Sequence, residues 1–132
     1  MSTPNRPLVY SCSGCSNVAQ LANALAVRLD REGLAEMSCI AGVGGRVPAL
    51  VSKARSGRPI LAIDGCRLQC VQGCLDQHGV TADVHLLLNE YGLKKRYGED
   101  CDAETAEQLY SEVVQLIASD RLQARRTDRS AS

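Results

Sequence analysis

The sequence contains no tryptophan and no phenylalanine, and tyrosine, with four residues, is its only aromatic residue type. So few aromatic side chains leave little surface on which nucleic-acid bases could stack. The sequence also has no excess of positive or negative charge, because its 15 Lys and Arg residues balance its 15 Asp and Glu residues. No net field therefore attracts the chain to a polyanion. Both absences argue against a nucleic-acid partner.

Long apolar runs are also missing, and none approaches the roughly 20 residues that a membrane-spanning helix needs. The first ten residues, MSTPNRPLVY, lack the charged start and apolar core of a secretion signal. We therefore expect no membrane partner and a cytoplasmic location. Seven cysteines are expected to stay reduced in that compartment. Metal binding or redox chemistry is then the leading explanation for them.

Short apolar segments alternate along the chain with segments whose apolar residues recur at helical spacing. The predicted strands are residues 8–12, 34–42, 58–64 and 82–90, and the predicted helices are residues 15–33, 47–56, a segment after residue 64, and 103–119. This alternation predicts the α/β class, with a single open, mostly parallel sheet of about four strands and helices on both faces, as in Rossmann-like or flavodoxin-like folds. We assume the strand order 2-1-3-4. Residues 1–119 would form the domain, and the Arg-rich residues 120–132 a flexible tail.

Several cysteines are predicted to meet at the carboxyl edge of this sheet, where ligands gather in open parallel sheets. Cys12 ends the first strand, Cys39 lies near the end of the second, and Cys66 follows the third. Cys15 opens the first helix. A thiolate is a soft anion that binds zinc or iron–sulfur clusters and is stabilised at helix N-termini.

The spacing of Cys66 and Cys70 suggests one helical face. Residues four apart on a helix differ by about 40° in azimuth and about 6 Å along the axis, so both thiols could chelate one ion. Cys74 is one step further along and is expected to be a small buried residue. Asp64, which precedes Cys66 and Cys70 in the sequence, could orient the loop by accepting a hydrogen bond, or could serve as a plain helix cap.

Glycines are expected to shape the same edge. Gly14 and Gly65 precede two of the cysteines and would permit close backbone approach. The segment Gly42–Gly45 is predicted to form a tight turn beside the thiols, because it matches neither a phosphate-binding nor a dinucleotide-binding motif.

The segments IDGCRLQC, YSCSGCSNVAQLANALA and MSCIAGVGG together resemble the DGC domain, a bacterial family named for its Asp-Gly-Cys motif and expected to bind zinc. The resemblance runs from residue 8 to about residue 98. It implies a zinc site whose four chelating cysteines correspond to Cys12, Cys39, Cys66 and Cys70. Cys15 is a further candidate that could replace Cys39. The resemblance assigns no catalytic residue and leaves the question of enzymatic activity open, with a non-enzymatic protein favoured.

Other functions stay open at this point. An iron–sulfur cluster would suit the same thiolates. The Cys12/Cys15 pair, between a strand and a helix, could instead serve a thiol-disulfide oxidoreductase. The basic residues 94–96 either form a solvated loop or form a patch that offsets the negative charge of a thiolate site or faces an acidic partner. A metal ion and a protein partner for metal or sulfur delivery are the expected partners. His78 and His85 are expected to be a helix-end residue and a satisfied strand residue.

Overall fold

The computed structural model describes residues 6–123, which fold around a four-stranded sheet in the order β2-β1-β3-β4 with every neighbouring pair parallel. The strands are β1 Leu8–Ser11, β2 Glu36–Met37, β3 Ile60–Asp64 and β4 Val84–Leu87. The helices are α1 Asn17–Arg31, α2 Ile40–Gly44, α3 Pro48–Ala54, α4 Cys70–Asp76 and α5 Ala103–Ile117, with short 3-10 turns η1 Leu88–Tyr91 and η2 Asp120–Leu122. The predicted fold class and the assumed strand order are both confirmed.

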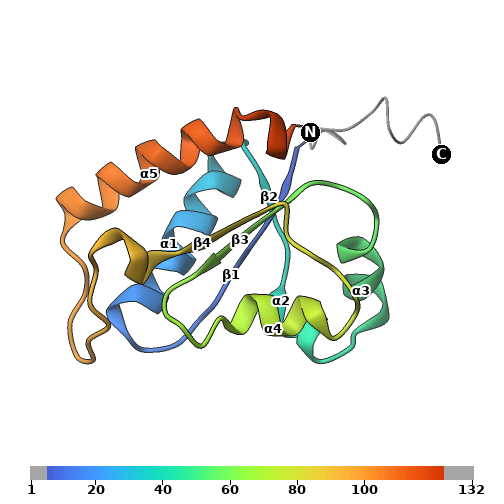
Figure 1. Cartoon of the computed structure of the whole chain (residues 1–132), viewed down its shortest axis with the longest axis horizontal. Helices are drawn as coiled ribbons and strands as arrows, with labels where there is room; N and C mark the ends of the chain where they lie inside the picture. Colours follow the sequence, from blue (N-terminus) through green and yellow to red (C-terminus); the bar gives the residue numbers. More distant parts are fainter. Residues whose placement is uncertain (1–5, 124–132) are drawn as a thin grey trace.

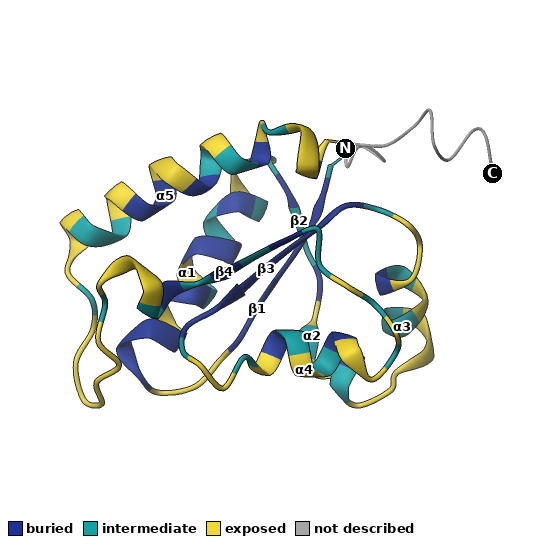
Figure 2. Ribbon diagram, in the orientation of Figure 1, coloured by how far each residue is buried: buried dark blue, intermediate teal, exposed yellow. Residues whose placement is uncertain are grey.

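Helices cover both faces of the sheet (Figure 1). α1 and α5 lie on one face, and α2, α3 and α4 lie on the other. The two central strands, β1 and β3, are consequently buried along their whole length (Figure 2). This explains their unbroken apolar sequences, which are typical of parallel strands covered on both sides. The edge strand β4 alternates between buried and half-buried residues instead.

The outer strands are shorter than predicted. Residues 34–42 contribute only the two residues Glu36 and Met37 to the sheet, and residues 82–90 contribute only β4 before the chain turns into η1. Both are edge strands, so each pairs with only one neighbouring strand, and the length of that pairing sets the length of the strand.

At the other end of the chain, Leu122 in η2 is buried against the core. The rest of the predicted tail, residues 124–132, lies outside the described residues, and within residues 6–123 no helix is apolar and long enough to span a bilayer.

The predicted glycine turn at residues 42–45 is wrong for residues 42–44, which belong to helix α2, and Gly45 is the C-cap of that helix. The Cys39 side chain caps that helix by accepting a hydrogen bond from the Gly42 amide at 3.4 Å. The glycines serve packing between helices: a Cβ on Gly44 would lie 2.8 Å from the Cys74 sulfur, and one on Gly42 would clash with Leu50. Small residues here let α2 lie close to α3 and α4.

The predicted helix carrying both Cys66 and Cys70 is also wrong, because α4 begins at Cys70. Residues 65–69 form a turn, and Gln69 adopts a left-handed conformation with φ 52°. A left-handed non-glycine residue interrupts a right-handed helix. Cys66 and Cys70 therefore belong to different elements, and the chelating geometry expected from helical spacing does not apply.

Gly65 is required by the close approach of α1 to the end of β3. A Cβ at this position would lie 2.8 Å from the Val18 carbonyl carbon and 3.0 Å from the Ala19 amide nitrogen. Both are backbone atoms, which cannot move aside as a flexible side chain would. The expected role of Gly65 in backbone approach is confirmed, and this contact brings the segments after β1 and β3 together.

We predict that Gly65→Ala lowers the free energy of unfolding by about 2–3 kcal/mol, the usual cost of forcing extra volume into a packed site. Gly73→Ala in α4 is the matched control, since a Cβ on Gly73 would meet no atom within 4 Å. Alanine should stabilise that helix position by about 1 kcal/mol. Urea unfolding of the two variants measures both effects, and a Gly65→Ala protein as stable as the native chain would contradict the packing argument.

Candidate functional site

Four cysteines line one cavity of about 240 Å³ at the carboxyl edge of the sheet. They come from the segment after β1 and from the segment between β3 and α4. These two segments lie side by side because Gly65, which has no side chain, lets them approach closely. The cysteines are Cys12, Cys15, Cys66 and Cys70. Leu68, Lys95 and Tyr97 also line the cavity. The arrangement places four soft donors around one small volume.

Cys12 is the most buried of these thiols, with 8% of its surface exposed. Its sulfur accepts a hydrogen bond from the Gly65 amide at 3.2 Å. Burial raises the pKa of the Cys12 thiol, the Gly65 hydrogen bond opposes that rise, and the nearby Asp64 carboxylate adds to it. Cys12 therefore favours the neutral thiol until a cation replaces its proton.

Cys66 is half-buried and faces a cation. The ammonium group of Lys95 lies 3.6 Å from the Cys66 sulfur and 5.4 Å from the centre of the Tyr97 ring. Interaction with the Tyr97 side chain is the main cause that raises the Lys95 pKa, and Cys66 contributes less. Lys95 is thus a permanent positive charge beside the sulfurs, which offsets negative charge that accumulates there.

Asn17 fixes the loop that carries Lys95. Its side chain donates to the Lys94 carbonyl at 3.0 Å and accepts from the Arg96 amide at 2.7 Å. Its own amide donates to the Arg96 carbonyl at 2.9 Å. The sequence pattern did not identify this role, because Asn17 and the loop lie nearly 80 residues apart and no local motif connects them.

Asp64 connects three elements behind the cavity and is only 1% exposed. One carboxylate oxygen accepts from the Val71 amide at 2.9 Å, and the other accepts from the Gln72 amide at 3.4 Å and lies 2.8 Å from His85 Nε2. These amides belong to the first turn of α4, where hydrogen-bond acceptors are needed. Asp64 therefore both caps the helix and orients it, and His85 is the satisfied strand residue that was expected.

The remaining cysteines lie elsewhere. Cys39 is exposed at the start of α2 and does not line the cavity. Cys74 packs against Gly44, and Cys101 lies near the Asn17 carbonyl, with a sulfur-to-oxygen distance of 3.7 Å. Burial raises the pKa of both of these thiols. All seven cysteines are free.

The four thiols surround the cavity without forming a compact ligand cluster. Within residues 6–123, no group of three or more His, Cys, Asp or Glu side chains is close enough together to hold a metal ion. The donor set has the chemistry of a zinc or iron–sulfur site. Three of its members lie in the loop after β1 or the turn after β3, and Cys70 is the first residue of α4.

The DGC domain profile matches residues 8–113, which is most of the chain. The chain belongs to the DGC domain family. A relative from Pseudomonas aeruginosa, the anaerobic and virulence modulator AnvM, is 70% identical over 111 residues, which cover 84% of this chain and 85% of the relative. No solved structure matches the chain. The membership confirms the resemblance and extends it beyond the thiol segments into α5.

We predict that Asp64→Ala lowers the free energy of unfolding by about 3 kcal/mol, because it leaves two helix amides and a half-buried imidazole without their charged partner. Asp76→Ala removes an exposed carboxylate from the other end of α4 and should change stability by less than about 0.5 kcal/mol. Chemical unfolding compares the two variants. Equal effects would show that Asp64 does not anchor α4.

Proposed function

We propose that this DGC protein is a metal-binding regulatory protein whose ligands are cysteines of the cavity at the carboxyl edge of the sheet. The observation that carries the proposal is the convergence of four thiols from two separate chain segments on one small cavity. Zinc is the first candidate metal and an iron–sulfur cluster is the alternative, since thiolates suit both. A bound metal supplies a cross-link between the segments after β1 and β3.

The ligand set favoured by the cavity is Cys12, Cys15, Cys66 and Cys70. The resemblance to the family favours Cys39 as the fourth ligand in place of Cys15. Cys15 lines the cavity, whereas Cys39 caps α2 and does not. Ligation would require the loop and the turn to bring their thiols closer, whereas ligation by Cys39 would require the start of α2 to move.

A regulatory role is supported by the name of the P. aeruginosa relative, an anaerobic and virulence modulator. Thiolate centres suit such a role because oxidants convert thiolates to sulfenic acids or disulfides, which no longer hold a metal in the same way. Oxygen or another oxidant would then change the occupancy of the cavity. The free cysteines also agree with a cytoplasmic location, where thiols stay reduced.

A protein partner for signalling or for metal or sulfur delivery would contact the rim of this cavity. Leu68 and Tyr97 line the cavity, yet they are 73% and 66% exposed. Large exposed apolar side chains beside a functional site are typical of interaction surfaces. Lys95, which also lines the cavity, would favour an acidic partner.

The alternative function, a thiol-disulfide oxidoreductase using Cys12 and Cys15, receives less support. Disulfide exchange requires a thiolate, and burial raises the pKa of Cys12. If the protein purified without oxygen turns over a disulfide substrate with a thiol reductant supplied, and Cys15→Ser abolishes that turnover without changing metal content, the oxidoreductase becomes the better proposal.

We predict about one metal centre per chain in protein purified without oxygen. Cys66→Ser and Cys70→Ser should each reduce metal content at least about tenfold, because each loses a thiolate ligand. Cys101→Ser is the control and should leave it unchanged. Elemental analysis and absorption spectra measure the metal content and separate colourless zinc thiolate from a brown iron–sulfur centre.

Comparison of the metal content of Cys15→Ser with that of Cys39→Ser identifies the fourth ligand. Full metal content in both Cys66→Ser and Cys70→Ser would refute the site.

We also predict that removing the metal leaves the sheet folded. The core of buried strand and helix residues is complete without it, unlike the core of a zinc finger. Far-ultraviolet circular dichroism before and after chelation, under reducing conditions, should show a retained α/β spectrum with a lower melting temperature. Wholesale loss of the spectrum would mean that the metal is a structural requirement of the fold.

A further inference from the structure

A second concave site lies among α3, the end of α2 and the segment after α4. Its volume is about 610 Å³, within the range of sites that bind small molecules. We call it the basic groove. Its lining residues are Arg46, Pro48, Val51, Ser52, Arg55, Ser56 and His78. None of these described lining residues is acidic, so the groove has positive charge and hydroxyl groups around an apolar floor.

No described residue neutralises either guanidinium in the basic groove. Within residues 6–123, the side chains of Arg46 and Arg55 make no hydrogen bond or ion pair. Arg58 nearby is different, because its guanidinium is bound to Glu36 and to the Arg6 carbonyl. Unpaired guanidinium groups in a concave site recognise carboxylate or phosphate groups through charge-assisted hydrogen bonds.

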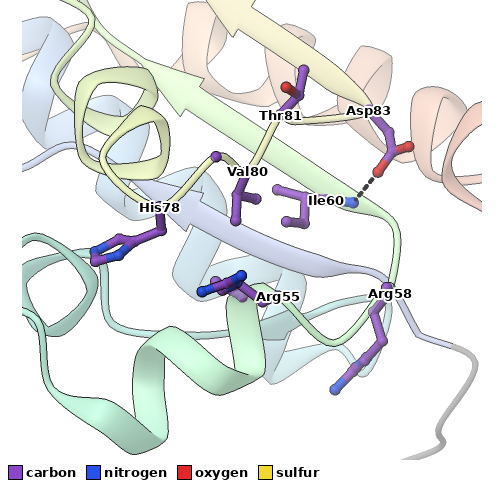
Figure 3. A pocket seen from close by; sticks show the side chains of 10 residues that line it. Arg55, Arg58, Ile60, His78, Val80, Thr81 and Asp83 are labelled. Atoms are coloured by element: carbon purple, nitrogen blue, oxygen red, sulfur yellow. Dashed lines mark hydrogen bonds between the residues drawn. The ribbon is translucent and has the colours of Figure 1, made fainter.

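His78 closes one side of the groove. Its Nε2 lies 2.8 Å from the Val43 carbonyl, which can only accept, so Nε2 carries the proton and Nδ1 remains for another partner. A smaller adjoining cavity of about 290 Å³ shares Arg55 and His78 with the groove. Figure 3 shows both side chains at this smaller cavity. Asp83, on the far side of that cavity, accepts from the Ile60 amide at 2.7 Å.

Arg46 adopts an unfavourable backbone conformation at this place. It follows the C-cap of α2 with φ 65°, a position that glycine usually occupies. An arginine there costs stability relative to glycine. The cations could simply complement the C-termini of three short helices. That explanation leaves the cost of a left-handed arginine at this position unaccounted for.

We propose that the basic groove binds a small organic anion, with its carboxylate or phosphate group on Arg46 and Arg55 and its apolar body on Val51 and Pro48. Ser52 supplies a hydroxyl donor for a remaining anion oxygen, whereas the Ser56 hydroxyl already donates to the Lys53 carbonyl at 2.7 Å. The site involves none of the seven cysteines, so it goes beyond the metal-binding function and does not depend on it.

The test is a titration of the full chain, reduced, followed by amide chemical shifts. The probes are phenyl phosphate, benzoate, inorganic phosphate and the neutral benzyl alcohol. We expect saturable shifts at residues 46–58 and 77–80 with both aromatic anions, weaker binding of inorganic phosphate, and none of benzyl alcohol. The tighter aromatic anion identifies the preferred headgroup. If inorganic phosphate bound as tightly as phenyl phosphate, the proposed contact of the ligand's apolar body with Val51 and Pro48 would be overturned.

Two variants separate binding from structure. Arg46→Gly and Arg55→Gln should each weaken the aromatic anions about tenfold, through the loss of one charge-assisted contact. Arg46→Gly should also keep or raise the melting temperature, because glycine suits its φ angle. Arg31→Gln, an exposed change at the end of α1, is the control with native affinity. Native affinity in both groove variants, or no saturable binding of either aromatic anion, would overturn the proposal.

Discussion

The buried carboxylate of Asp64 holds the carboxyl edge of the sheet together. It ends β3, accepts from the first amides of α4 and bonds to His85 on β4, so one side chain fixes three elements. A charge with 1% exposure is tolerated only when every oxygen has a partner. The start of α4, and with it Cys70, is positioned by this requirement.

Gly65 explains why the Asp-Gly-Cys motif requires three adjacent residue types. The aspartate orients α4, the glycine lets α1 approach the turn, and the cysteine that follows enters the cavity. The close approach of α1 at Gly65 places the three roles side by side at the end of β3. The cavity is therefore a consequence of how β3 is joined to α4.

The fold could be predicted from the sequence because buried parallel strands and amphipathic helices have different apolar periods. Local errors arose where tertiary contacts decided the conformation. The glycines at residues 42 and 44 suggested a turn, but they serve contacts of α2 with Leu50 and Cys74. The spacing of Cys66 and Cys70 suggested one helix, but the hydrogen bonds to Asp64 set the helix start. The role of Asn17 had no local signal at all.

The corrected position of Cys66 bears on the proposed metal binding by the thiol cavity. Two thiols on one rigid helix would hold a fixed separation, whereas Cys66 on a turn and Cys70 on α4 can change theirs when the turn rearranges. Gln69, left-handed at φ 52°, is the residue between the two elements. Such a conformation is of higher energy for glutamine than for glycine, so a modest gain from ligation can favour a different turn. Under the proposed metal-binding function, such a site would respond to its ligand by local rearrangement, while Asp64 keeps the rest of α4 in place.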